Sequence, residues 1–320
     1  MKESVDLLRI RNVHKVFRQG RTPVRVLRGV NFYVRPGEIV ALVGESGCGK
    51  STLARTILRL HVPDEGMIEF EGNDVTQVRG RLLRDYRQHV QMIFQDPFAS
   101  LNPTHCVQTI MRRSSPRIGL HFNWVERDAL IRQSLEVVGI SPAENFLRKY
   151  PHELSGGQRQ RVAIARSLVV QPKLVVADEP VSMLDVSLRL GVLNLMMDLN
   201  QKFGVAYVYI THDLASARYV ASRIAVMYAG DIIEEGTANA IIEEPRHPYT
   251  RVLVKAAPDP ERTGYSEDID MVKGEPPNLG EDFRGCPFQF RCMEVHDQCK
   301  TEVPSSRDTG TAHYVSCHLY

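Results

Sequence analysis

The sequence predicts an α/β fold with a largely parallel sheet covered on both faces. The segment 38–43 is a continuous apolar run that ends at a glycine-rich loop, and helically spaced apolar residues follow at 51–60. Further apolar runs at 90–94, 174–177 and 205–210 also end in polar residues. Such uninterrupted runs are typical of strands buried on both faces. Because ligands of parallel α/β sheets bind outside the carboxyl ends of the strands, these polar residues are expected to converge.

The opening third of the chain predicts a partly antiparallel subdomain. Residues 7–13, 24–34 and 67–70 read as strands, with turns at Pro36-Gly37 and 64–66.

The middle and the last part of the chain differ from this pattern. Residues 104–150 lack strand character and read mainly as helices, in a helical subdomain expected at about 96–165. From about residue 245 prolines punctuate the sequence, which predicts a C-terminal appendage at 245–320 after a main domain at 1–244. Residues 258–283 read as a linker within this appendage.

The bulk composition indicates a soluble globular protein. Of the 320 residues, 43% are apolar and 24% are charged, and the net charge is +2. This balance gives no support to a broad nucleic-acid-binding face, and no nucleic-acid partner is expected. No apolar run reaches the roughly 18–20 residues that cross a bilayer. Residues 1–6 lack the apolar core of a secretory signal, so a cytoplasmic location is expected.

The glycine-rich loop has the spacing G-x-x-x-x-G-K-S of a phosphate-binding loop, in the required context between a strand and a helix. Its glycines let several backbone N–H groups face one anion, and the following helix adds its positive N-terminal end. Lys50 is expected to reach the β- and γ-phosphates, and the Ser51 hydroxyl to bind Mg²⁺. Cys48 fills a spacer position. The residues expected to contact ATP here are Gly44, Ser46, Gly47, Cys48, Gly49, Lys50, Ser51 and Thr52.

Two acidic residues follow the apolar run at 174–177. Asp178 suits a magnesium ion held partly through water, and Glu179 would polarise or deprotonate the attacking water. Alone the pair would read as exposed strand-end acids, but downstream of a phosphate-binding loop it predicts part of the same site. His212, in Thr-His-Asp after the run at 205–210, is read in the same way.

A second glycine-containing segment, Ser155-Gly156-Gly157-Gln158, opens a predicted helix that runs to about Leu168. Ser155 is a good N-cap, and the two glycines leave backbone N–H groups uncovered. Read alone, this is an ordinary capped helix. Since one nucleotide uses one phosphate loop, a second anion-binding terminus predicts a second nucleotide or a second protomer.

From residue 7 to about residue 240 the chain resembles the ATPase subunits of ABC transporters. The matching positions, in chain order, are Phe17 (the aromatic that stacks on adenine), Gly44–Thr52 (Walker A), Gln95 (Q-loop), Leu154–Gln158 (signature), Leu174–Asp178 with Glu179 (Walker B and catalytic glutamate), Asp185 (D-loop) and His212 (switch histidine). Met183 departs from the alanine that is common in the D-loop. The resemblance implies a P-loop NTPase with a RecA-like core, an antiparallel β-subdomain, an α-helical subdomain and a small C-terminal cysteine-rich appendage.

The resemblance also implies a mechanism in which two subunits pack head to tail with ATP at each seam. The Walker motifs of one subunit would face Ser155 and Gly157 of the other. Catalysis is then assigned to Glu179, His212, Gln95 and Lys50, and Mg²⁺ binding to Ser51, Gln95 and Asp178. Further implied ATP contacts come from Phe17, Gln95, Ser155, Gly156, Gly157, Gln158, Asp178 and Asp185. Such catalysis is mostly positioning and electrostatics.

Several segments resemble the oligopeptide/dipeptide/nickel branch of ABC importers more closely. They are 94–103, 150–153, 247–250, 274–277 and the terminal cysteines. The stretch from Arg84 onward is similar to the F-type ATPase of this branch, which implies a non-identical second ATPase, two permease subunits, and an extracellular or periplasmic solute-binding protein. The chain would then lie at the cytoplasmic face of the membrane. Residues 104–125 follow the branch poorly, so the solute (peptide, nickel or oligosaccharide) stays open.

Four of the six cysteines, Cys286, Cys292, Cys299 and Cys317, crowd into the last part of the chain. Their spacing lacks the C-x2-C pair of common zinc modules. Thiolate-only ligation suits zinc or an iron–sulfur cluster. Members of the resembled branch can hold a [4Fe–4S] cluster, which is therefore the first hypothesis, followed by zinc, disulfides and free thiols.

These patterns together predict an ATP-hydrolysing subunit that powers uptake of peptides or a related solute. The alternative is a soluble ABC ATPase of DNA repair or translation. Such proteins typically carry tandem ATPase units or an insertion within the ATPase, whereas this chain has one phosphate loop and one signature segment.

Overall fold

The computed structural model describes residues 6–20, 22–96, 100–115, 124–256, 277, 284–310 and 312–320. The chain divides into two compact units. Unit 1 is formed by residues 1–78 together with 208–320, and unit 2 by residues 79–207. Each unit is described by itself.

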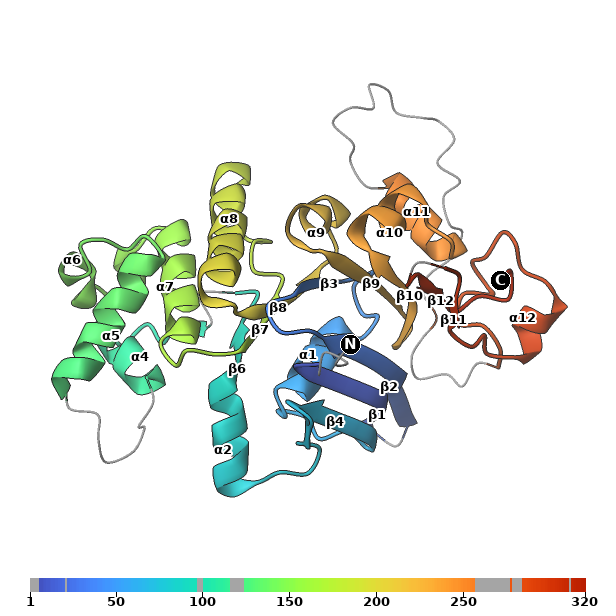
Figure 1. Cartoon of the computed structure of the whole chain (residues 1–320), viewed down its shortest axis with the longest axis horizontal. Coiled ribbons are helices and arrows are strands. Elements are labelled where there is room, and N and C mark those ends of the chain that lie inside the picture. The colour runs from blue at the N-terminus through green and yellow to red at the C-terminus, as the bar shows by residue number, and fades with distance from the viewer. Residues whose placement is uncertain are drawn as a thin grey trace, which may run out of the picture. The chain divides into compact units, whose positions relative to one another are not determined.

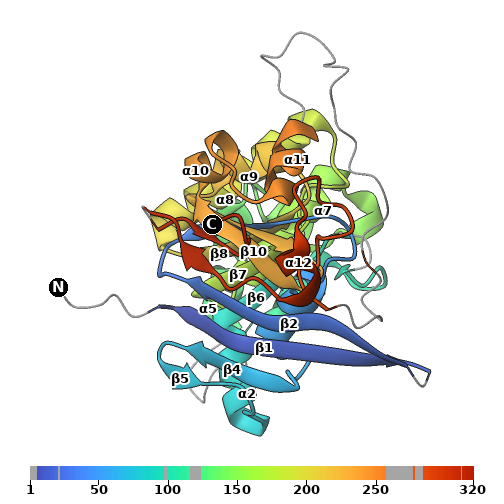
Figure 2. The same cartoon turned by 90° about the vertical axis from the view of Figure 1, so that its right-hand side faces the viewer.

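Unit 1 contains an antiparallel sheet with the strand order β2-β1-β4-β5. Figure 2 shows these four strands as one layer. Their bounds are Leu8–Gln19 (β1), Thr22–Val34 (β2), Glu65–Phe70 (β4) and Asn73–Asp74 (β5). Leu8 and Ile10 are buried while Arg9 and Arg11 are exposed, which is the alternation of a sheet with one covered face. The predicted antiparallel subdomain is confirmed.

A second sheet of unit 1 has the order β11-β12-β10-β9-β3-β8. The bounds are Ile39–Val43 (β3), Ala206–Thr211 (β8), Arg223–Tyr228 (β9), Asp231–Thr237 (β10), Arg307–Asp308 (β11) and Tyr314–Val315 (β12). Every residue of β3, β8 and β9 is buried, and β3 pairs with β9 in parallel. The sheet is mixed, since β10 runs antiparallel to both β9 and β12.

Helices cover this second sheet on both faces. The helix α1 (Lys50–Ile57) lies on one face, and α9 (Leu214–Val220), α10 (Ala238–Glu243) and α11 (Pro248–Ala256) lie on the other (Figure 1). Full coverage explains why β3 is apolar along its length and why β9 is apolar apart from Arg223 and the hydroxyl of Tyr228. A short helix, α12 (Asp297–Thr301), precedes the last strands.

Unit 2 combines a parallel strand pair with a helical cluster. Strand β6 (Val90–Ile93) pairs with β7 (Leu174–Asp178). The remaining elements are α2 (Gly80–His89), α4 (Val107–Ser114), α5 (Trp124–Val137), α6 (Glu144–Leu147), the 3₁₀ helix η1 (Pro151–Glu153), α7 (Gly156–Leu168) and α8 (Val186–Phe203). Helices α4, α5 and α7 pack against one another (Figure 1). The helical reading of 104–150 is confirmed for its described residues.

The predicted C-terminal segment contributes to unit 1. Tyr314 and Val315 of β12 pair with Glu235 and Glu234 of β10. The predicted linker at 258–283 lies outside the described residues, apart from residue 277. The domain boundary at residue 245 stays a prediction.

Candidate functional site

The phosphate-binding loop lies between β3 and α1, as predicted. Gly44 has a φ of 157°, and a Cβ added there would lie 2.2 Å from the carbonyl oxygen of Met227. Only glycine fits this position, because no real Cβ contact is so short. Loop and helix together have the form of an anion-binding cradle.

Lys50 is folded back onto its own loop. Its ammonium group donates to the carbonyl oxygens of Gly44 at 2.7 Å and Glu45 at 2.8 Å, and the residue is only 6% exposed. These contacts hold the charge over the loop. Cys48 is buried beside it, and burial raises the pKa of its thiol, which keeps the thiol protonated and unreactive.

Phe17 on β1 is part of a small aromatic and cationic group. Its ring lies edge-on to His61, with ring centroids 5.1 Å apart, and the Lys15 ammonium lies 5.4 Å from the Phe17 centroid. Burial is the main cause that lowers the pKa of His61, and the positive charges of Arg55 and Lys15 lower it further. Neither Lys15 nor His61 was picked out from the sequence, because nothing in the local pattern links residues so far apart.

The predicted switch histidine, His212, is exposed and follows β8 directly. The next residue, Asp213, caps α9 by accepting the backbone N–H of Ala215 at 3.0 Å. The Thr-His-Asp segment is therefore a strand-to-helix turn with His212 at its exposed point.

Unit 2 brings two predicted catalytic residues together. The side-chain amide of Gln95, after β6, donates to a carboxylate oxygen of Glu179 at 2.9 Å. Asp178 ends β7 and is 7% exposed. Glu179 has a φ of 45°, in the left-handed region that non-glycine residues rarely adopt. Such backbone strain is common at functional sites, where it aims a side chain.

The signature segment starts α7 as predicted. The Ser155 hydroxyl accepts the Gln158 backbone N–H at 3.2 Å, and the Gln158 side chain accepts the Ser155 N–H at 3.0 Å. This is a reciprocal capping box. A Cβ at Gly156 would meet nothing within 4 Å, whereas one at Gly157 would lie 3.1 Å from Leu188. The helix terminus therefore has an open approach at Gly156.

The D-loop aspartate, Asp185, is the N-cap of α8. It accepts the Leu188 N–H at 2.9 Å and the Ser187 hydroxyl at 2.8 Å. The hydrogen bond from Leu188 lowers the pKa of Asp185 the most, and the one from Ser187 lowers it further. The family resemblance implied an ATP contact for Asp185, and its capping role was missed, although an aspartate before a helix is the usual signal of an N-cap.

The four terminal cysteines, Cys286, Cys292, Cys299 and Cys317, line one small pocket of about 10 Å³. Burial is the main cause that raises the pKa of Cys286 to about 11, and the neighbouring thiols contribute to the same shift. Among the described residues, no group of three or more His, Cys, Asp or Glu side chains has the arrangement of a metal site. The thiols share a pocket, but they do not surround an ion-sized centre.

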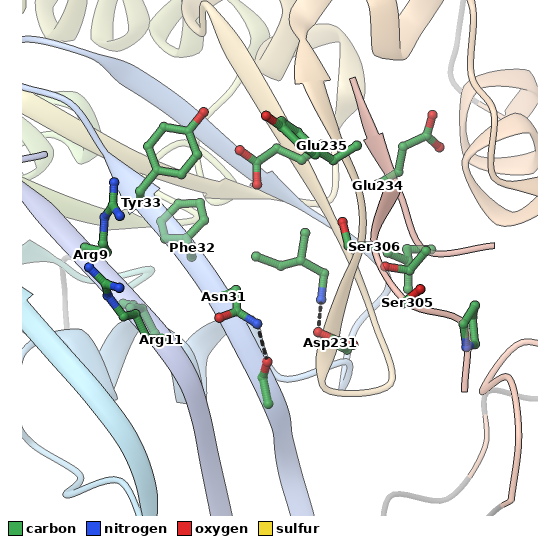
Figure 3. A pocket seen from close by; sticks show the side chains of 17 residues that line it. Arg9, Arg11, Asn31, Phe32, Tyr33, Asp231, Glu234, Glu235, Ser305 and Ser306 are labelled. Atoms are coloured by element: carbon green, nitrogen blue, oxygen red, sulfur yellow. Dashed lines mark hydrogen bonds between the residues drawn. The ribbon is translucent and has the colours of Figure 1, made fainter. Parts of the chain in front are cut away.

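A larger cavity of about 600 Å³ in unit 1 was not anticipated from the sequence. Figure 3 shows Arg9 and Arg11 on one side and Asp231, Glu234 and Glu235 on another. Its arginines already pair elsewhere, Arg9 with Asp6 and Arg11 with Glu69. Burial raises the pKa of Asp231 to about 7.

Unit 2 has a groove of about 570 Å³ that is rich in arginine. The arginines that line it are Arg84, Arg87, Arg112, Arg113 and Arg127. Arg112 forms a bidentate pair with Asp128, at 3.0 and 2.6 Å. The exposed Trp124 also lines the groove. The described lining therefore carries a local positive charge that the balanced composition conceals.

Two family models match the chain. The one described as ABC transporter covers residues 27–182, and the one described as oligopeptide/dipeptide transporter, C-terminal region, covers residues 233–299. The oligopeptide transport ATP-binding protein AppF of Bacillus subtilis is 39% identical over 98% of this chain and 97% of that protein. None of these matches supports the alternative of a DNA-repair or translation ATPase.

Solved structures with a similar fold support the same assignment. One is the ATP-binding cassette MJ0796 in a dimeric post-hydrolysis state bound to ADP and Pi, with 29% identity, a TM-score of 0.63, and coverage of 72% of this chain and 98% of that one. Another is cbiO1 from Clostridium perfringens, part of the transporter complex cbiONQ, with 26% identity, a TM-score of 0.66, and coverage of 75% and 91%. In the described part of the chain, no helix has the length and apolarity to span a bilayer.

Proposed function

Because the chain belongs to the ATP-hydrolysing subunits of ABC transporters and carries the C-terminal region of the oligopeptide/dipeptide type, we propose that it powers the import of peptides through a membrane permease. The proposal that the chain hydrolyses ATP rests on the hydrogen bond between Gln95 and Glu179, the residue after Asp178. The peptide class rests on the C-terminal family match and on the transport named for the Bacillus relative.

The residues divide the work of ATP hydrolysis. The loop 44–52 binds the phosphates, and Lys50 exchanges its contacts with the loop carbonyls for the β- and γ-phosphate oxygens. Glu179 takes the proton of the attacking water, and Gln95 fixes the direction of its carboxylate. His212 stabilises charge on the γ-phosphate. Ser51, Gln95 and Asp178 would hold Mg²⁺, which would supply positive charge opposite the phosphate oxygens.

Two such subunits are proposed to act together. The helix terminus at Ser155 and Gly156 would face the phosphate loop of a partner ATPase, since a Cβ added at Gly156 would meet nothing within 4 Å and leaves this position open to approach. The dimeric state of MJ0796 supports this arrangement. The F-type resemblance favours a non-identical partner at the cytoplasmic face of the membrane, together with two permease subunits and an external solute-binding protein.

The arginine groove of unit 2 is proposed to contact the permease. Arg84 and Arg113 are exposed there, so an acidic permease segment would meet complementary charge. Reversing these charges (Arg84→Glu with Arg113→Glu) should reduce co-purification with the permease while the ATPase activity of the isolated subunit persists. Unchanged recovery would exclude this groove as the contact.

The cysteine pocket is proposed to hold zinc or a [4Fe–4S] cluster. The support is chemical, since four thiols line one pocket and thiolates suit both metals. A cluster or a zinc ion would need the thiols to rearrange, because in this structure they do not form a metal-holding group. Anaerobic purification followed by metal analysis and absorbance near 400 nm tests this. Cys299→Ser should lower the metal content and Cys106→Ser should not. A metal-free wild type would end the proposal.

The transport function is tested by isolating the complex from cells. We expect recovery of two permease chains and a second ATPase, and peptide-stimulated ATP hydrolysis when the complex is reconstituted with its binding protein. Recovery with ribosomes or DNA in place of a permease would overturn the proposal.

A further inference from the structure

The first variable residue of the phosphate loop, Glu45, forms a long-range ion pair. The guanidinium of Arg291 donates to both of its carboxylate oxygens, at 2.9 and 3.1 Å. The side chain of Arg291 is 9% exposed and that of Glu45 is 30% exposed. The two residues are 246 positions apart, and both lie in unit 1. A bidentate arginine–carboxylate pair with one partner this buried has a fixed geometry.

Aromatic side chains hold Arg291 in place. Its guanidinium lies 5.8 Å from the centroid of Tyr228 and 5.9 Å from that of Phe288, and it donates to the Tyr228 hydroxyl at 3.3 Å. Phe288 in turn packs against Tyr228 and Tyr249, with centroids 5.3 and 5.6 Å apart. These contacts restrict the arginine to the rotamer that reaches Glu45.

The C-terminal segment also holds the backbone of Glu45. The N–H of Glu45 donates to the hydroxyl oxygen of the buried Tyr249 at 2.9 Å. The carbonyl oxygen of Glu45 accepts from Lys50 at 2.8 Å. Thus the N–H, the carbonyl and the carboxylate of this one residue are all engaged, and the partners of the N–H and of the carboxylate, Tyr249 and Arg291, come from residues after 245.

The negative charge of Glu45 is unfavourable for phosphate binding, because the residue belongs to the phosphate loop. The loop binds a polyphosphate, and an unpaired carboxylate on the partly exposed Glu45 side chain would repel that anion. Arg291 neutralises the carboxylate and keeps it turned toward the C-terminal segment. Without Arg291, Glu45 would act against the phosphates and would be free to attract Lys50 away from them.

We propose that Arg291 is a positioning residue for the ATP site, which sets the affinity of the phosphate loop for ATP by neutralising and orienting Glu45. The proposal rests on the ATPase activity of the family. It makes the C-terminal segment a determinant of nucleotide affinity, acting through a single ion pair.

The test is a double-mutant cycle with ATP binding and hydrolysis measured separately. Arg291→Gln should weaken binding of a fluorescent ATP analogue about tenfold and raise KM for ATP equally, with kcat changed less than about twofold. Glu45→Gln alone should bind at least as well as the wild type. Glu45→Gln combined with Arg291→Gln should recover wild-type affinity, because no unpaired carboxylate remains.

Controls separate this role from a structural one. Arg291→Lys keeps the charge and should retain most of the affinity, and the exposed Arg307→Gln should change nothing. Thermal unfolding of each variant detects misfolding. If Arg291→Gln does not fold, Arg291→Met, which keeps much of the length of the side chain but not its charge, takes its place in the cycle, with the same expected loss of affinity and the same rescue by Glu45→Gln.

Three results would overturn the proposal. They are unchanged affinity in Arg291→Gln, failure of Glu45→Gln to restore it, and a loss confined to kcat. A wild-type protein that neither binds nor hydrolyses ATP would instead contradict the ATPase assignment itself.

Discussion

The side-chain amide of Gln95 donates a 2.9 Å hydrogen bond to the Glu179 carboxylate across 84 residues of sequence. The amide thereby fixes the direction of the group that is assigned to activate water. Replacing Glu179 with Gln keeps the shape but removes the base, so kcat should fall at least about 100-fold. ATP should still bind and should accumulate in a stable dimer, which gel filtration detects. The exposed Glu136→Gln is the matched control, and near-wild-type turnover in Glu179→Gln would remove the assignment.

Removing the amide tests the same relationship from its other side. Gln95→Ala leaves Glu179 without this partner, and kcat should fall about tenfold or more through loss of orientation. In the Glu179→Gln background the Gln95→Ala change should have little further effect, since coupled residues are not additive. Independent, additive losses measured by single-turnover kinetics would show that Gln95 acts elsewhere.

The cap formed by Asp185 predicts a stability effect separate from ATP binding. Asp185→Ala removes the acceptor for the N–H of Leu188 and should destabilise the first turn of α8, which lowers the urea midpoint. Asp185→Asn keeps a capping oxygen and should lose much less. Urea unfolding of nucleotide-free protein measures both, and equal losses would argue against capping as the cause.

Stability should depend on pH through Asp231. Burial raises its pKa to about 7 from a reference value of 3.8. Between these values the folded protein holds a proton that the unfolded chain has lost, so this group favours folding at about pH 4 and progressively less as the pH rises to 7. Asp231→Asn is neutral throughout and should flatten this part of the stability profile. The exposed Asp198→Asn should not, and an unchanged profile for Asp231→Asn would refute the prediction.

A buried ionic network around Arg223 predicts the largest loss of stability. Its guanidinium pairs with Glu38 at 2.8 Å, with Glu235, and with the carbonyl oxygen of Tyr33 at 2.7 Å. Arg223→Met would remove the cation that the carboxylates of Glu38 and Glu235 share and should cost about 3–5 kcal/mol of the free energy of unfolding.

The matched control for this network is an exposed pair. Arg218→Met breaks the ion pair between Arg218 and Glu243 and should cost less than about 1 kcal/mol. Denaturant midpoints compare the two variants, and similar losses would show that burial is not decisive.

The sequence was informative where structure is local. Strand β3 and the loop after it were predictable, because a strand covered on both faces is apolar throughout and the following turn demands glycine at residue 44. The capped start of α7 at Ser155 was predictable for the same reason, since the capping box joins residues three positions apart.

Contacts between distant segments were not predictable in this way. The pairing of Glu45 with Arg291 depends on how unit 1 folds, and neither residue stands in a distinctive pattern. Strand β12 has two residues, too few for any periodicity. Arg223 could have been noticed, because a single arginine within an apolar strand usually signals a buried partner, but its partners could not be named.

Unit 1 is formed by two separate parts of the chain, so its two parts are synthesised at different times. Strand β3 is made before residues 79–207 and its neighbour β9 after them, so β3 leaves the ribosome long before this partner exists, whereas β1 and β2 can pair at once. Unit 2 is continuous and can complete its contacts during that interval, since domains fold in the order they emerge. The phosphate loop must then wait for Arg291. If Arg291 sets the affinity as proposed, a nascent chain acquires its full affinity for ATP only after residue 291 has been made.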